Sequence, residues 1–258
     1  MKCVPIPPHV WHRRASWLVR IVVAACALCG TATATAQALI SPVVVEFGPK
    51  QKIATVRVTL SDKAIKPVRL QAQLLLWRQD VHGVAITQPS DELIVAPRIA
   101  EIKPGQQQVL RVALRGSLPA ATERAYRLVL EDIAQPSSVD IGGGASVNFR
   151  MAYDLPVMVS PRGPVVTALH WRNCPAPKEA PVSKETCLRI KNAGNRRVKA
   201  QVLTLAGDGW QQSLRLKEPE VILAGDEREW VVPAGGALQS VQVHTPSGEV
   251  LKAEARGA

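Results

Sequence analysis

Few side chains in this sequence could carry out chemistry, and their spacing favours no catalytic site. The histidines beyond residue 38 are His82, His170 and His244, and none has a neighbouring cysteine, serine elbow or carboxylate pair that would complete a catalytic or metal site. The glycine run at 142–144 precedes a predicted strand and not a helix, so it does not predict a phosphate-binding loop. The sequence therefore predicts a protein that is not an enzyme and has no cofactor.

Two cysteines, Cys174 and Cys187, remain when the first 38 residues are set aside. In an oxidising compartment such a pair, close in sequence, predicts one local disulfide with a structural role. The alternative is a pair of metal ligands, but neither a histidine nor a second cysteine pair lies at a usable spacing. We therefore expect a disulfide and no metal.

Residues 1–38 have the pattern of a secretory signal peptide. Their basic residues are Lys2, Arg13, Arg14 and Arg20. The apolar run at 21–29 follows, and it is too short to span a bilayer. Small residues at alternate positions then predict cleavage after Ala36 or Ala38. The adjacent arginines also resemble a twin-arginine signal, and residues 23–26 resemble a lipid-attachment site, but both matches are short.

The chain is basic, with 32 Lys and Arg against 21 Asp and Glu and a formal net charge of +11. Four basic and no acidic residues lie in 1–38, so 28 basic and 21 acidic residues remain and the net charge falls to +7. These charges are scattered along predicted strands and turns, without a basic patch interleaved with aromatic side chains. The pattern does not favour nucleic acid as a partner.

Short apolar runs separated by glycine and proline predict an all-β chain, because no long stretch has the periodicity of an amphipathic helix. The best linker is the proline- and glycine-containing stretch at 161–164. We therefore expect an N-terminal immunoglobulin-like sandwich over 39–161, with about seven strands, and a C-terminal β-sandwich over 162–258.

The most distinctive stretch is 145–161, where large apolar residues alternate with small or polar ones. The apolar members are Val147, Phe149, Met151, Tyr153 and Leu155. A period of two predicts a single β-strand with one face that requires an apolar partner. That partner is either the core of the chain's own domain or another protein to which the strand is donated.

Several motifs, in order, resemble the periplasmic pilus-assembly chaperones of the PapD-like family, and most closely their archaic branch that serves spore-coat-protein-type pili. The motifs lie at 40–47 (ISPVVVEF), 74–80 (LLLWRQD), 92–112, 122–133, 155–161 (LPVMVSP) and, more faintly, 187–199. The resemblance implies two immunoglobulin-like domains in a boomerang arrangement. It also implies that the strand at 145–159 completes the unfinished sandwich of a pilus subunit, and that the subunit is delivered to an outer-membrane usher.

One part of the family pattern is missing. Well-studied members grip the subunit's terminal carboxylate with an Arg and a Lys, but the aligned positions here are Val44 and Pro156. If 126–133 and 145–155 form a hairpin, Arg127 lies near the interdomain cleft and becomes the main candidate anchor. Secondary candidates are Arg150 and Arg98. The alternative is that Arg127 only braces the fold by pairing with Asp154 or Glu123.

The resemblance favours a periplasmic chaperone with pilus subunits as partners and no small-molecule substrate. The competing interpretation is a secreted structural or adhesive protein built from immunoglobulin-like modules. A pilus subunit should lack its last strand and carry an N-terminal donor extension, whereas this chain has a short mature N-terminus and a full set of predicted strands. The pattern therefore favours a chaperone that donates a strand over a pilus subunit that receives one.

Overall fold

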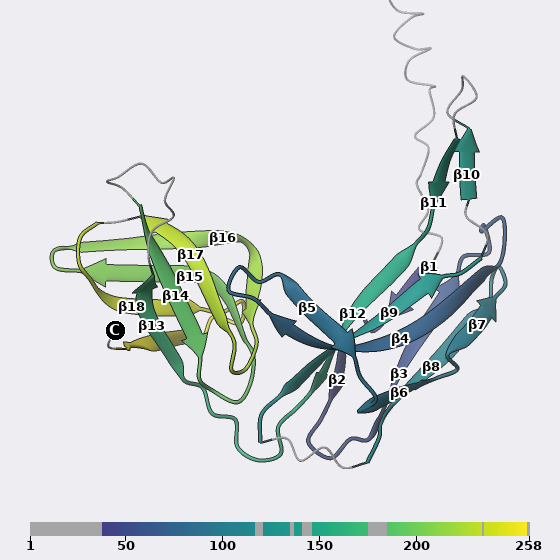
Figure 1. Ribbon diagram of the computed structural model, residues 1–258, viewed down its shortest axis with the longest axis horizontal. Coiled ribbons are helices and arrows are strands. Elements are labelled where there is room, and N and C mark those ends of the chain that lie inside the picture. The colour runs from purple at the N-terminus through teal and green to yellow at the C-terminus, as the bar shows by residue number, and fades with distance from the viewer. Residues whose placement is uncertain are drawn as a thin grey trace, which may run out of the picture. The chain divides into compact units, whose positions relative to one another are not determined.

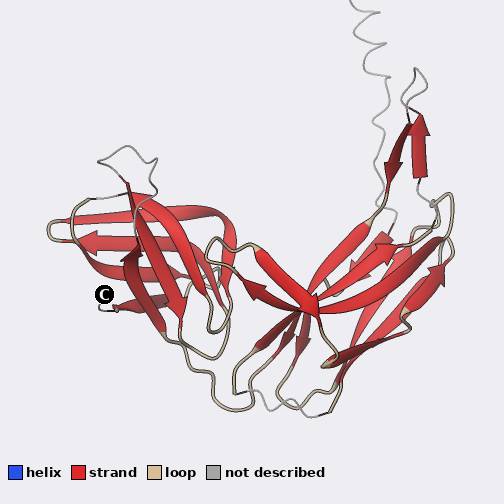
Figure 2. Ribbon diagram, viewed as in Figure 1, coloured by secondary structure: helices blue, strands red, loops and turns tan. Residues whose placement is uncertain are grey.

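The computed structural model describes residues 38–116, 121–134, 137–140, 146–174, 185–233 and 235–256, with the backbone alone described for 137–140 and 146–149. The expected signal peptide lies outside these residues, apart from Ala38. All regular elements in the described residues are strands, in agreement with the predicted all-β class (Figure 2). In this part of the chain, no helix is long and apolar enough to cross a membrane.

Strands β1–β12 form the N-terminal half (Figure 1). A four-stranded sheet, in the order β1-β3-β8-β6, contains β1 (Ala38–Ser41), β3 (Ile53–Leu60), β8 (Gln107–Leu114) and β6 (Leu93–Ala96). A second sheet, in the order β2-β12-β9-β4-β5 with β7 on β4, contains β2 (Val45–Phe47), β12 (Ala152–Val159), β9 (Arg124–Asp132), β4 (Val68–Gln79), β5 (Ala85–Pro89) and β7 (Ile99–Ile102).

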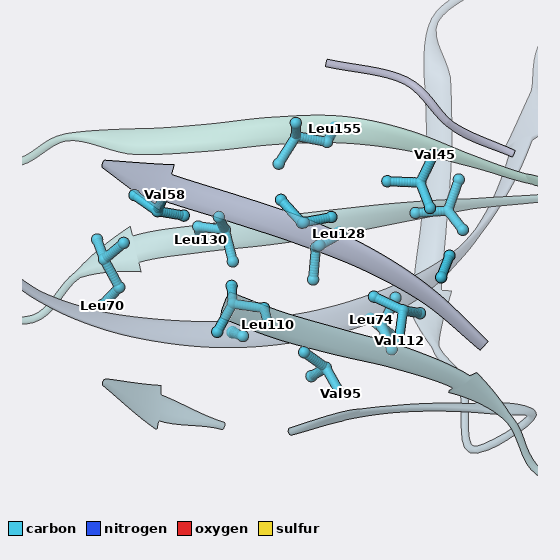
Figure 3. Close-up of a cluster of buried hydrophobic side chains, with 14 of the residues drawn as sticks. Val45, Val58, Leu70, Leu74, Val95, Leu110, Val112, Leu128, Leu130 and Leu155 are labelled. Carbon is cyan, nitrogen blue, oxygen red and sulfur yellow. The ribbon is translucent and has the colours of Figure 1, made fainter. Parts of the chain in front are cut away.

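The inner faces of these two sheets enclose one apolar core (Figure 3). Alternation along β3 buries Val56 and Val58, and alternation along β9 buries Leu128 and Leu130. Leu155 on β12 belongs to the same core. Each such side chain stabilises the fold by about 1.5–3 kcal/mol relative to leaving it exposed, so strand period and burial together fix which face of each sheet turns inward.

Strands β13–β19 form the C-terminal half as one seven-stranded sheet in the order β16-β15-β18-β19-β13-β14-β17. Their bounds are β13 (Leu169–Cys174), β14 (Glu185–Asn192), β15 (Val198–Gly207), β16 (Trp210–Ile222), β17 (Glu227–Pro233), β18 (Leu238–His244) and β19 (Val250–Ala255). The two end strands meet, because Glu220 on β16 accepts hydrogen bonds from Arg228 and Trp230 on β17. The sheet thus closes around a separate core that includes Leu188, Ile190 and Val243.

The predicted single strand over 145–159 is wrong in one respect, because the structure divides it. Strand β11 (Ser146–Phe149) pairs with β10 (Ser137–Asp140) in a two-stranded ribbon, whereas β12 pairs with β9. The interruption has a local cause: the side chain of Asp132, the last residue of β9, accepts the backbone N–H of Ala134 at 3.0 Å. This side-chain turn ends β9 at Asp132, so the pairing between β9 and β12 ends with the hydrogen bond from the Asp132 N–H to the Met151 carbonyl.

Candidate functional site

Strand β12 has an open edge over part of its length. On one side β9 pairs with it from Ala152 to Val159, whereas on the other side β2 runs parallel to it only from Val157 to Val159. Within the described residues, therefore, the backbone of 152–156 has a strand neighbour on one side only. An unpaired strand edge is a template for adding a strand from another chain.

The side chains from Leu155 back to Met151 change from buried to exposed. Leu155 is 4% exposed in the core, Tyr153 is half-buried against it, and Met151 is 57% exposed. Burial, and to a smaller extent the negative charge of Asp132, raises the pKa of the Tyr153 hydroxyl. The domain's own core thus engages Leu155 and part of Tyr153 but leaves Met151 free.

The remaining residues predicted to be donated, Val147 and Phe149, lie on β11, where the backbone alone is described. Val147 pairs with Val139 and Phe149 with Ser137 across the ribbon. This ribbon continues from the β9–β12 hairpin, and its two strands join neither of the larger sheets of the N-terminal half (Figure 1). The predicted hairpin between 126–133 and 145–155 is therefore present, but each of its two sides is divided into two strands, β9 and β10 on one side and β11 and β12 on the other.

Arg127 lies on the outer face of the second sheet, opposite to the core. Its register partners are Pro156 on β12 and Leu75 on β4. The parallel register Val45–Val157, continued by one residue, brings Val44 beside Pro156. Val44 and Pro156 are thus neighbours in this sheet, and Arg127 is the next residue in the same cross-strand row.

The guanidinium of Arg127 is held by two contacts on this face. Its Cζ atom lies 3.7 Å from the centre of the Trp77 ring, and its Nη1 atom lies 3.7 Å from a carboxylate oxygen of Asp154. Its side chain is 19% exposed, and its buried Nε–H has no hydrogen-bond acceptor. Because 3.7 Å is long for a charge-assisted hydrogen bond, donors of Arg127 remain for a further acceptor.

The row next to Arg127 on this face contacts the C-terminal half. Trp77, Ala125 and Met158 pack against Leu223, and Val221 lies at the edge of this cluster. Arg127 therefore lies directly beside the contact between the two sandwiches. Trp77 is buried in this contact and not in the core of its own domain.

Two buried carboxylates, Asp226 and Glu123, flank the same contact and pair with arginines. Asp226, 5% exposed, accepts hydrogen bonds from Arg78 at 2.6 Å and from the backbone N–H of Gln79 at 3.1 Å. Glu123 accepts hydrogen bonds from the side chain of Arg197 and, at 3.0 Å, from its backbone N–H. Of the two alternative partners expected for Arg127, Glu123 is thus engaged by Arg197, and Asp154 is the one near Arg127.

The other two candidate anchors have different neighbours. Arg150 lies between β11 and β12 and pairs with Glu131 at 3.2 Å. Arg98 lines a cavity of about 420 Å³ between β4 and β6, together with Arg115. The structure does not bring these arginines together with Arg127 into one site.

Cys174 and Cys187 face each other across β13 and β14 with 5.0 Å between their Cα atoms, and their sulfur atoms are bonded. Glu229 is the only described side chain that groups with them as a potential third metal ligand. Glu229 binds Arg189, and bonded sulfurs are not thiolates, so the donor set does not fit a metal ion.

Two tandem β-sandwiches, the first with an open strand edge, define the class of two-domain immunoglobulin-like proteins. Residues 36–164 match the family model described as pili and flagellar-assembly chaperone, PapD N-terminal domain. Because this match covers half of the chain, the chain belongs to that family. No curated protein matches the chain in sequence.

Solved structures with similar folds include that of the CsuC–CsuE chaperone–tip adhesion subunit pre-assembly complex from archaic Csu pili of Acinetobacter baumannii. The TM-score is 0.63 at 19% identity, covering 86% of this chain and 100% of that chain. The class 5 fimbriae chaperone CfaA gives 0.59 at 12% identity, with 84% and 98% covered. The Escherichia coli chaperone DraB gives 0.52 at 18% identity, with 85% and 96% covered. At these identities the similarity concerns the fold.

Proposed function

We propose that this chain is a periplasmic chaperone that binds pilus subunits by donating the segment 145–159 to their unfinished sandwiches and presents them to an outer-membrane usher. The expected signal peptide supports export to the periplasm, and the family supports the subunit as partner. The observation that carries the proposal is the open edge of β12 at 152–156, next to side chains that change from buried to exposed.

Physical chemistry explains why such a subunit needs this partner. A sandwich without its last strand exposes an apolar groove and an unpaired edge, which promote aggregation. Donated side chains fill the groove, each with about 1.5–3 kcal/mol on full burial before the cost of ordering is subtracted. Val147, Phe149 and Met151 are the residues proposed to enter the groove, with Tyr153 shared between the two cores.

The test is co-purification of candidate pilus subunits with the mature chain. The variant Phe149→Asp/Met151→Asp should retain less than about a tenth of the wild-type capture, because burying one unpaired charge costs several kcal/mol. A matched control is Ile53→Asp/Ile94→Asp, which puts the same charges on exposed apolar positions of the other sheet. Equal capture by wild type and the Phe149/Met151 variant would contradict strand donation, and capture by none would favour the structural-module alternative.

We also propose Arg127 as the anchor of the subunit's terminal carboxylate. Three observations support this role: Arg127 lies opposite Pro156, it stacks on the Trp77 ring, and its contact with Asp154 is long at 3.7 Å. Arg127→Ala should weaken capture at least about tenfold, because bidentate guanidinium–carboxylate pairs in partly desolvated sites are strong. The control Arg57→Ala removes an exposed arginine on β3, in the other sheet, and should have little effect.

Capture of a subunit with extra residues at its C-terminus distinguishes carboxylate binding by Arg127 from mere stabilisation of the fold, because the extension displaces the terminal carboxylate. The extension should weaken capture by wild type but add nothing to the loss in Arg127→Ala. If Arg127→Ala instead lowers the free energy of unfolding and leaves capture by the folded protein intact, the arginine only stabilises the domain through Asp154.

A further inference from the structure

The sulfur atoms of the chain differ sharply in accessibility. The sequence contains five cysteines and three methionines, of which Met1, Cys3, Cys26 and Cys29 lie in the expected signal peptide. Cys174 and Cys187 are bonded to each other. Met158 is 3% exposed within the contact between the sandwiches, whereas Met151 is 57% exposed. Beyond the signal peptide, Met151 is therefore the only reduced sulfur that solvent can reach.

Met151 also occupies a sensitive position. It lies between β11 and β12, and its carbonyl oxygen accepts a hydrogen bond of 2.9 Å from the backbone N–H of Asp132. The backbone at this point is thus fixed to β9 while the side chain remains open. Of the alternating apolar residues, Leu155 lies in the domain's own core and Tyr153 packs against that core, whereas the Met151 side chain is exposed.

We infer that Met151 is a reversible oxidation site through which hydrogen peroxide lowers the affinity of the protein for its subunit. This inference rests on the proposed function. The thioether sulfur attacks an oxygen of the peroxide, the O–O bond breaks and an S–O bond forms. The sulfur loses two electrons, and the peroxide is reduced to water. A methionine sulfoxide reductase reverses the step: the oxygen leaves as water, and the dithiol reductant is oxidised to a disulfide.

The sulfoxide weakens binding for a physical reason. Methionine is a flexible apolar side chain that adapts to irregular grooves, whereas its sulfoxide carries a strong hydrogen-bond acceptor. Inside an apolar groove that oxygen loses its water and gains no donor. The disulfide cannot respond to the same oxidant as a thiol would, so the response is concentrated at Met151.

The experiment treats the mature chain with graded hydrogen peroxide, maps oxidised methionines by peptide mass spectrometry, and measures subunit capture. Met151 should gain one oxygen well before Met158, and capture by wild type should then fall about tenfold, which corresponds to one unpaired buried acceptor. The readout is the ratio of treated to untreated capture for each protein, so a change in the basal capture of Met151→Leu does not affect it. This ratio should fall in wild type and stay near one in Met151→Leu, because leucine has no sulfur to oxidise. Methionine sulfoxide reductase should restore wild-type capture.

Three outcomes would overturn the inference: undiminished capture by protein fully oxidised at Met151, an equal loss in Met151→Leu, or oxidation of Met158 before Met151. Met158→Leu with Met151 intact serves as the matched control and should lose capture on oxidation like wild type. Failure of untreated wild type to capture any subunit would instead overturn the proposed function, and this inference with it.

Discussion

At the scale of single residues, Tyr126 is the most completely enclosed polar side chain of the N-terminal core. Its hydroxyl donates a hydrogen bond to Glu92 Oε2, and Arg124 binds the other carboxylate oxygen of Glu92 at 2.7 Å. Burial, and then the hydrogen bond to the Glu92 carboxylate, raises the pKa of the Tyr126 hydroxyl. This chain of polar contacts links β9 to the turn before β6.

Tyr126→Phe should lower the free energy of unfolding by about 1.5–3 kcal/mol, because the lost hydrogen bond has a charged acceptor. A double-mutant cycle with Glu92→Gln in urea isolates that interaction. Because the folded pKa exceeds the unfolded value of about 10, the unfolded state loses its proton first, and wild-type stability should fall as pH rises above about 10. Tyr126→Phe should show a shallower fall, and parallel alkaline profiles would contradict the assignment.

The positions of single site residues were predictable where they depended only on the pairing of two strands adjacent in sequence. The hairpin that contains Arg127 was expected from the sequence, and its register sets Arg127 opposite Pro156. The stacking on Trp77 was not predictable, because it depends on a third strand, β4, whose pairing with β9 leaves no signal in either sequence. The pairing of Glu123 with Arg197 and of Asp226 with Arg78 was not predictable for the same reason, since these partners lie 74 and 148 residues apart in sequence.

At the scale of elements, the sequence predicted strands that bury alternate side chains and missed strands that do not. Strand β5 has every residue exposed, so its pairing with β4 arises from backbone hydrogen bonds at a sheet edge, without an apolar pattern. The break between β11 and β12 was hidden as well, because the apolar alternation continues through it. Only Asp132, followed by Pro136, could have indicated it.

The disulfide closes the β13–β14 connection, and the two cysteines are 13 positions apart in sequence. Cys174→Ser/Cys187→Ser should lower the free energy of unfolding by about 3 kcal/mol, since the unfolded chain regains the entropy of an open loop. Urea unfolding measures this loss, and thiol titration of native and denatured wild type should find no free thiol. Subunit capture at 25 °C should persist; its loss would show that the C-terminal sandwich takes part in binding.

At the scale of the whole molecule, the contact between the sandwiches combines a small apolar cluster with buried charge. Asp226→Ala should speed tryptic cleavage after Arg162 in the linker several-fold, because it removes the acceptor that joins Arg78 and Gln79 to the C-terminal half. Asp91→Ala is the matched control, since its pair with Arg115 is exposed and long at 3.8 Å. Equal cleavage rates for both variants would mean that the apolar cluster alone maintains the contact.

Strand β12 is fixed from both sides at Val157–Val159, by β2 and by β9, and only the stretch before it is open. A strand anchored in this way stays part of the chaperone when a bound subunit is transferred to its next partner. The chaperone domain then does not have to refold. Each molecule can then serve many subunits in succession, in the manner of an enzyme's turnover. A cell assembling a long polymer would therefore need far fewer copies of this protein than of the subunits it handles.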